Sequence, residues 1–222
     1  MNSHAQEDCM SQELQLPPPE SRTLVGNTTT IKKYPFAVQV GKDMLENAPF
    51  KGGGLYVDPA DFYIHVGTTR DHEAGGKRYE VSAIIHHENF TYFVNDIALV
   101  RTREPVGLGP TVATVSVNNL GTENLYLTSK VKLIGWGSAG SSNSKVLQEV
   151  SIQLIGWDLC ANIYSKKGIT TTNMICGERP TGEGMCAFHL GGPLVLGDIL
   201  VAIASSFSCQ DKKIQDLYTM FI

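Results

Sequence analysis

The stretch Cys186-Ala187-Phe188-His189-Leu190-Gly191-Gly192-Pro193 decides how this sequence is interpreted. Expected β-strands follow it directly, and a leucine, Leu190, stands before its two glycines. Two short apolar segments follow it, at residues 195–196 and 199–203, and both are typical of β-strands. At its centre, the leucine side chain has no oxygen to deprotonate and cannot attack a carbonyl carbon. Covalent catalysis through Leu190 is therefore excluded.

The rest of the chain repeats this pattern of short strands broken by turn residues. Further strands are expected at residues 36–40, 63–66, 81–85, 97–100, 131–134 and 150–154. Residues 157–165 are the one candidate for a short helix, with Asp158 placed favourably near its N-terminus. Many short strands with regular turns predict an all-β barrel or sandwich.

Composition limits the classes of function. The chain has 222 residues, of which 42% are hydrophobic, 18% are charged and 22 are glycine, and this describes a folded, loop-rich β-protein. Its formal net charge is -4 without a basic stripe, which argues against nucleic acid as a partner. No apolar run approaches the roughly 18 residues that cross a bilayer, so no membrane partner is expected.

Two segments lack regular patterning. Residues 1–22 are polar and include Pro17-Pro18-Pro19, and we expect them to form a flexible pro-segment. They lack the apolar centre of a signal peptide. Residues 107–127 are irregular and suit a link between two halves of the fold.

Cysteines indicate an oxidising compartment. Four of the five lie in the C-terminal half, at Cys160, Cys176, Cys186 and Cys209, whereas Cys9 stands alone. An even set of this kind favours two disulfides, although spacing alone leaves three pairings and free cytosolic thiols open. Two N-glycosylation sequons, Asn27-Thr28-Thr29 and Asn89-Phe90-Thr91, fit secretion but also arise by chance.

Several short motifs occur in a fixed order along the chain. They are Leu24-Val25-Gly26-Asn27, Tyr34-Pro35-Phe36-Ala37-Val38, Gly52-Gly53-Gly54-Leu55, Asn95-Asp96-Ile97-Ala98-Leu99, Gly135-Trp136-Gly137, Asn173-Met174-Ile175-Cys176, Gly191-Gly192-Pro193 and Leu217-Tyr218-Thr219. With these motifs the chain resembles the chymotrypsin/trypsin family of serine proteases from Leu24 onward. The segment from Cys160 to Cys176 looks most like the mite members, which are the group 3 mite allergens and the inactivated protease paralogues of the scabies mite.

The resemblance implies an all-β, chymotrypsin-like fold of two six-stranded antiparallel β-barrels. The domain would span residues 23–222, with an N-terminal barrel at about 24–108 and a C-terminal barrel at about 128–222. The resemblance also implies the disulfides Cys160–Cys176 and Cys186–Cys209.

The catalytic triad of the family is incomplete in this sequence. The family uses Ser, His and Asp, in which histidine takes the serine proton and aspartate holds the histidine. Asp96 matches the aspartate, Leu190 replaces the serine, and the segment that should end in Ala-Ala-His-Cys is absent. Lys51 replaces the cysteine that would pair with the cysteine of that segment. The resemblance therefore implies an inactive protease, or an active one whose chain is given without a segment.

The positions that would bind substrate have changed as well. The floor of the specificity pocket falls at Gly184, followed by Met185, and Ser206 and Asp216 replace glycines on its facing walls. Because any Cβ narrows such a pocket, these residues are expected to block the entry of a side chain. Phe188 replaces the glycine of the oxyanion hole, where a glycine-like backbone is disfavoured for phenylalanine.

The activation switch is also altered. In the family, cleavage after a basic residue frees an ammonium that pairs with the aspartate before the catalytic serine. Here Arg22-Thr23 precedes Leu24, and His189 occupies the aspartate position. A histidine supplies no anion, so the freed terminus would gain no ion pair.

The remaining polar candidates have ordinary explanations. Asp96 is expected to be a buried carboxylate paired with backbone donors. His86 and His87 are neighbours on a strand, so they point to opposite faces and cannot share a metal ion. His189 is expected to be a packed neutral histidine, and His65 belongs to a strand and does not replace the base. We expect neither a metal nor a cofactor.

The sequence is best interpreted as a secreted, extracellular pseudoprotease that acts by binding. Its resemblance to the scabies mite paralogues implies host extracellular proteins as partners, such as complement or other defence proteases. Two alternatives remain open, namely a trypsin-like serine endopeptidase whose chain is given without a segment, and a purely structural or allergenic secreted protein.

Overall fold

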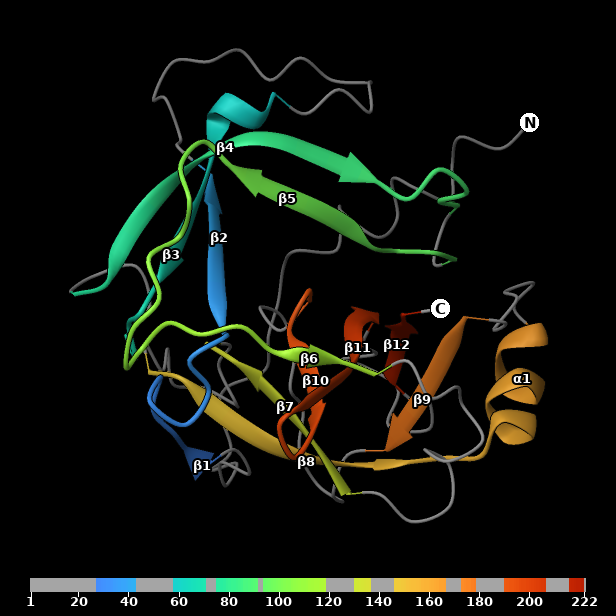
Figure 1. Ribbon diagram of the computed structural model, residues 1–222. Coiled ribbons are helices and arrows are strands. Elements are labelled where there is room, and N and C mark those ends of the chain that lie inside the picture. The colour runs from blue at the N-terminus through green and yellow to red at the C-terminus, as the bar shows by residue number, and fades with distance from the viewer. Residues whose placement is uncertain are drawn as a thin grey trace, which may run out of the picture.

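Two β-sheets account for most of the regular structure. The computed structural model describes residues 27–42, 58–70, 75–91, 94–118, 130–136, 146–166, 173–178, 190–206 and 216–221. Figure 1 shows the smaller sheet above the larger one, with the only described α-helix at the side of the larger sheet. The strands are β1 (Asn27–Thr28), β2 (Val38–Lys42), β3 (Phe62–Val66), β4 (Lys77–His86), β5 (Ala98–Thr102), β6 (Ser116–Val117), β7 (Lys130–Gly135), β8 (Gln148–Leu154), β9 (Met174–Glu178), β10 (Pro193–Leu196), β11 (Ile199–Ser206) and β12 (Asp216–Met220).

The larger sheet closes into a six-stranded antiparallel barrel. Its strands follow the order β8-β7-β10-β11-β12-β9, and β9 pairs again with β8. The short strands β1 and β6 attach outside this ring, β1 to β8 and β6 to β11. The closed ring confirms the all-β fold class and shows one of the two predicted barrels complete.

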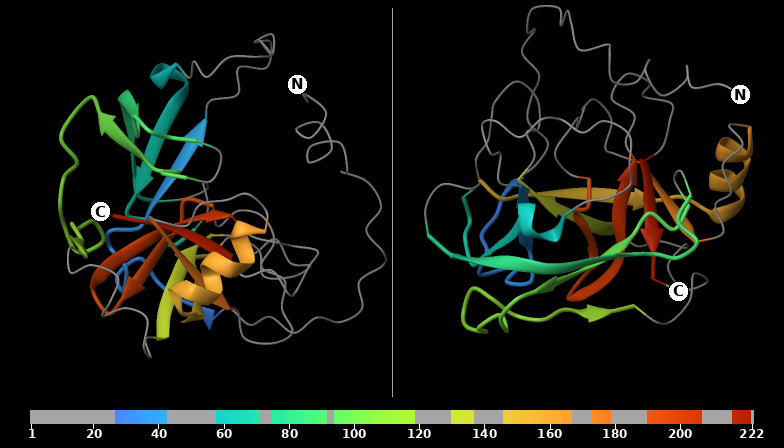
Figure 2. Two further views of the ribbon diagram at one scale, coloured as in Figure 1. Left: turned by 90° about the vertical axis from the view of Figure 1, so that its right-hand side faces the viewer. Right: turned by 90° about the horizontal axis from the view of Figure 1, so that it is seen from above.

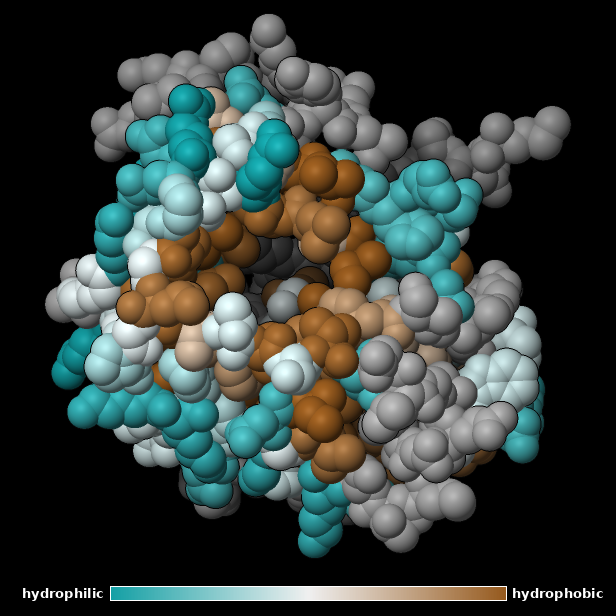
Figure 3. Space-filling view, viewed as in Figure 1, coloured by the Kyte–Doolittle hydropathy of each residue, from teal (hydrophilic) through white to brown (hydrophobic). Residues whose placement is uncertain are grey.

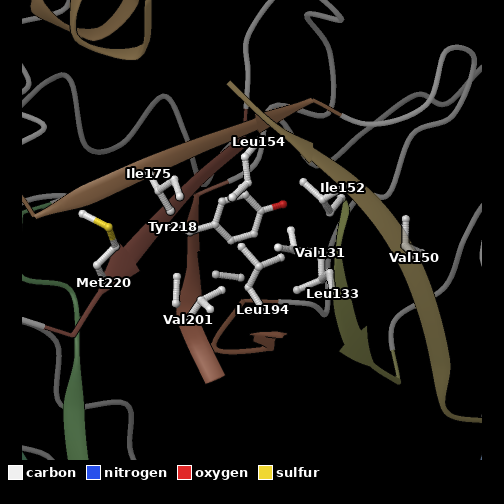
Figure 4. Packing of buried hydrophobic residues seen from close by; sticks show 12 residues of the cluster. Val131, Leu133, Val150, Ile152, Leu154, Ile175, Leu194, Val201, Tyr218 and Met220 are labelled. Carbon is white, nitrogen blue, oxygen red and sulfur yellow. The ribbon is translucent and has the colours of Figure 1, made fainter. Parts of the chain in front are cut away.

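Side chains from all six strands fill this barrel. Tyr218 of β12 is fully buried, and its ring lies among aliphatic side chains from the neighbouring strands (Figure 4). Gly177 of β9 makes room for this packing, because a Cβ there would overlap Ile152 and lie 3.1 Å from the ring of Tyr218. The cluster consists of Val131, Leu133, Val150, Ile152, Leu154, Ile175, Leu194, Val201, Ala202, Ala204, Tyr218 and Met220.

The smaller sheet shows the N-terminal barrel only in part. It has four antiparallel strands in the order β2-β3-β4-β5 within the described residues, where the sequence predicts six strands in a closed ring. Its core centres on Ile64, Val66, Tyr79 and Val81. Figure 3, in the view of Figure 1, shows a hollow with hydrophobic residues around it between this sheet and the barrel.

Strand β2 reverses the usual burial of apolar and polar residues. Val38 and Val40 are 43% and 54% exposed, whereas Gln39 is buried and donates a hydrogen bond from Nε2 to the Arg70 carbonyl at 3.0 Å. Gly41 lies under the ring of Tyr63, and any Cβ at this position would overlap that ring. The inner face of the small sheet is therefore only partly covered at β2.

The segment before β2 anchors the chain to the barrel. Ile31, Tyr34 and Ala37 are buried against Ile134, Leu147 and Val195. Beside them, Lys33 and Tyr34 hydrogen-bond to the carboxylate of Glu149 at 2.6 and 2.8 Å. Burial alone would raise the pKa of Glu149, but these hydrogen bonds outweigh it and lower the pKa to about 2.

Helix α1 (Trp157–Ser165) lies beside β9, as Figures 1 and 2 show, and coincides with the helix expected from the sequence. It presents Cys160 and Tyr164 to the interior, where both are buried. A disulfide joins Cys160 to Cys176 of β9, which is the pairing that the family resemblance implies. Cys186, Cys209 and the expected pro-segment at residues 1–22 lie outside the described residues.

Candidate functional site

The site centres on a hydrogen bond between the two sheets. Asp96 lies two residues before β5, and Ser205 lies near the end of β11. The Ser205 hydroxyl donates to Oδ2 of Asp96 at 2.7 Å. Asp96 is half-buried and Ser205 is buried, so this bond is shielded in part from water. The donor that the structure describes for Asp96 is thus a side-chain hydroxyl. From the sequence, backbone N–H donors were expected instead.

Leu190 lies beside the strand that carries Ser205. The next residue, Gly191, donates its N–H to the Ala204 carbonyl at 2.8 Å, and the Ala204 N–H returns a bond to Gly192 at 3.0 Å. Gly191 has φ +78°, a left-handed conformation that favours glycine. Leu190 itself is 62% exposed. Local pairing therefore brings Leu190, which the resemblance places at the position of the family's serine, close to the Ser205–Asp96 contact.

Two asparagines hold the loop that carries Asp96. Asn95 has φ +55°, which asparagine tolerates better than most residues. Its Oδ1 accepts a bond from Asn173 Nδ2 at 2.8 Å, and its own Nδ2 donates to the Asn89 carbonyl at 2.9 Å. The loop is thereby tied both to the residue before β9 and to the turn after β4.

The described histidines do not complete a catalytic pair. His65 is buried on β3, and its Nε2 lies 2.8 Å from the Gly75 carbonyl. His86 and His87 are exposed, and His87 Nδ1 accepts a bond from the Asn89 N–H at 3.1 Å. Among the histidines that the structure describes, none hydrogen-bonds to Asp96 or Ser205. His189 lies outside the described residues.

Two of the residues that the resemblance places at the specificity pocket, Asp216 and Ser206, belong to the described strands. Asp216, the first residue of β12, is only 1% exposed and pairs with Gly177 of β9. Burial raises the pKa of Tyr164 to about 12, and the negative charge of Asp216 adds to this rise. Ser206 ends β11, is half-buried and pairs with Leu217. Gly184, Met185, Phe188 and Leu24 lie outside the described residues.

Metal and membrane signals are absent from the described parts of the chain. No group of three or more His, Cys, Asp or Glu side chains is placed there to hold a metal ion. No helix in these segments is long and apolar enough to span a bilayer.

Comparison with known proteins identifies the family. The family model described as Trypsin matches residues 56–222. This chain belongs to the trypsin family. Trypsin beta of Drosophila erecta is 25% identical over 223 residues, which cover 91% of this chain and 85% of that protein. Trypsin of Phaedon cochleariae is 32% identical over 171 residues, which cover 74% of this chain and 65% of that protein.

Solved structures with the same fold include two proteins from the scabies mite. The inactivated protease paralogue S-D1 matches with a TM-score of 0.69 and 20% identity, over 89% of this chain and 92% of that one. The inactivated protease paralogue S-I1 matches with a TM-score of 0.71 and 20% identity, over 88% and 92% of the two chains. The resemblance to the trypsin family that the sequence motifs suggest is confirmed, and the fold is chymotrypsin-like.

Sequence reasoning missed three contacts that shape this region, namely Ser205–Asp96, Asn95–Asn173 and the Glu149 cluster. The first joins residues 109 positions apart, and such a pairing leaves no local pattern in the sequence. The Asn-Asp dipeptide at 95–96 was the one available signal, because asparagine is enriched at positive φ and often marks a constrained turn.

Proposed function

We propose that this protein is a catalytically inactive member of the trypsin family that acts by binding another protein. One observation carries the proposal, which is the leucine directly before Gly191-Gly192-Pro193, where the family has its nucleophilic serine. Leu190 lies on a turn, and Gly191 and Gly192 after it pair through their backbone with Ala204, the residue before Ser205. An aliphatic side chain offers neither a nucleophile nor a proton.

The contacts of Asp96 support the same proposal. In a working triad the aspartate orients the histidine. Here the described bond of Asp96 is to Ser205, and the described hydrogen bonds of His65 and His87 are made elsewhere. Asp96 then serves to fasten the small sheet to the barrel.

For the partner, we propose extracellular host proteins, with complement or other defence proteases as the leading class. Two features support secretion, namely the disulfide Cys160–Cys176 and membership of a family that includes insect trypsins. The structural neighbours from the scabies mite, named inactivated protease paralogues, support a role that does not depend on catalysis.

A pull-down from host plasma tests the binding role. The full chain would be immobilised beside an active-site-blocked trypsin, which shares the fold and controls for non-specific adsorption. We expect plasma proteases or complement components to be enriched on this chain alone, as measured by quantitative mass spectrometry. Equal recovery on both resins would contradict the binding role and favour a purely structural or allergenic protein.

A further inference from the structure

We infer that Asn89 is an N-glycosylation site and that its glycan stands at the rim of the site around Asp96. The inference rests on the secretory route that the proposed function requires, and it does not depend on the identity of any partner. The sequon Asn89-Phe90-Thr91 lies in the turn that follows β4. Three features of this turn carry the argument, namely its exposure, the freedom of its acceptor groups and its position.

The turn presents the whole sequon to solvent. Its backbone is fixed by a bond from the Phe90 N–H to the His87 carbonyl at 3.0 Å and by two bonds exchanged between Thr91 and Val94, at 3.0 and 2.9 Å. Asn89, Phe90 and Thr91 are all exposed, and Phe90 is 41% exposed despite its apolar ring. A bulky glycan at such a tip displaces no packed side chain.

The chemical groups that glycosylation uses are also free. In the secretory pathway the oligosaccharide is transferred from a lipid pyrophosphate carrier: the bond between its first sugar and the phosphate breaks, a bond to the Asn amide nitrogen forms, and the lipid pyrophosphate and the amide proton are released. Recognition requires the hydroxyl of the third sequon residue. Within the described residues, neither the side-chain amide of Asn89 nor the hydroxyl of Thr91 makes a hydrogen bond, because the contacts of Asn89 involve its backbone N–H and carbonyl. The folded protein therefore keeps both groups accessible.

The other sequon differs in this respect. Asn27 lies in β1, which pairs with β8, and the Thr29 N–H donates to the Leu147 carbonyl at 2.9 Å. Thr29 is 8% exposed, and its hydroxyl hydrogen-bonds to Glu149. Folding thus occupies the hydroxyl of this sequon, so Asn89 is the site that we expect to be filled most completely.

The position of Asn89 places its glycan beside the loop that carries Asp96. The Asn89 carbonyl accepts the bond from Asn95 Nδ2, and Asn95 directly precedes Asp96. A glycan on Asn89 therefore grows from a turn that is fastened to the loop of the site. It would cover Phe90 and restrict the approach of large proteins to Asp96, which directs partner binding to other faces.

The test expresses the full chain behind a heterologous signal peptide in human cells, which directs it into the secretory pathway. Digestion with peptide N-glycosidase F in H₂¹⁸O, followed by peptide mapping, should convert Asn89 to labelled aspartate. N89Q and Thr91→Ala should each lose one glycan. Thr91→Ser, which preserves the sequon, and N27Q should both keep the glycan at Asn89.

Secreted, folded protein with unmodified Asn89 would overturn the inference. So would the loss of a glycan in N27Q while N89Q remains unchanged. These outcomes are read from masses alone, so they are independent of the plasma pull-down. A glycosylated protein that captures no partner would contradict the proposed function and leave the modification site in place.

Discussion

The hydroxyl of Ser205 donates a hydrogen bond to the carboxylate of Asp96, with 2.7 Å between the two oxygen atoms. This bond involves no histidine among the described residues. Its geometry suits a structural role, since it joins the loop before β5 to strand β11 across the boundary between the two sheets.

We predict that Ser205→Ala lowers the free energy of unfolding by about 1 to 3 kcal/mol, because a half-buried carboxylate loses a charge-assisted hydrogen bond. Urea titration followed by fluorescence measures this loss. The matched control is Ser82→Ala, which removes an exposed hydroxyl bonded to the Arg101 carbonyl and should change stability by less than about 0.5 kcal/mol. Equal effects of the two variants would argue against a special role for the Asp96 bond.

Glu149 gives a second prediction at the scale of single residues. Its hydrogen bonds with Lys33 and Tyr34 lower its pKa from the ordinary value of 4.5 to about 2. Because the folded pKa is depressed, the stabilisation is complete above about pH 5 and is lost as the pH falls towards 2. Between pH 7 and pH 3 the wild type should lose about 2 kcal/mol more stability than Glu149→Gln. Parallel pH profiles for the two proteins, measured by urea unfolding, would contradict the assigned hydrogen bonds.

At the scale of elements, the pattern of the sequence located most strands but not how they are covered. Helix 157–165 was predicted with its observed bounds, and the strands expected at 131–134 and 150–154 fall within β7 and β8. Strand β2 shows what hydrophobic periodicity in the sequence leaves undecided. Alternation separates Val38 and Val40 from Gln39, but periodicity alone does not tell which face the rest of the fold covers. The fold class was therefore predictable, whereas the face of β2 that is buried was not.

Packing in the closed barrel can be tested at Gly177. We expect Gly177→Ala to destabilise the protein by about 1 to 3 kcal/mol, because the new methyl group would overlap Ile152 and crowd Tyr218 inside a filled core. Gly109→Ala is the control, since a Cβ there meets no atom within 4 Å. Thermal unfolding should separate the two variants, and a Gly177→Ala protein as stable as the control would show that the core is looser than described.

On the scale of the whole molecule, several contacts besides Asp96–Ser205 connect the N-terminal half to the barrel. Trp136 Nε1 donates to the Thr69 carbonyl at 3.1 Å, and the Leu147 N–H donates to the same oxygen at 2.8 Å. An isolated bridge pairs Arg70 with Val146. These bonds hold residues 69–70 of the N-terminal half against the residues that follow β7 and precede β8.

The candidate site could be predicted from the sequence only in part. Short motifs of consecutive residues can be recognised in the sequence, and examples are Gly191-Gly192-Pro193 and Asn95-Asp96. The bonds that bring them together arise from barrel closure and from pairs far apart in the chain, which the sequence does not display. The leucine at position 190 can be read directly from the sequence, whereas the hydrogen bond between Ser205 and Asp96 required the fold.

Active-site titration tests the central claim most directly. The purified protein, before and after treatment with trypsin, would be incubated with a fluorescent serine-directed phosphonate beside an active trypsin. Because loss of triad residues costs such enzymes roughly 10⁶-fold in rate, we predict no label on the wild type. We also predict none on Leu190→Ser or on Leu190→Ser with His189→Asp, since a serine without a base stays unactivated. Stoichiometric labelling of the wild type, traced to this chain by mass spectrometry, would contradict the account of an inactive protease.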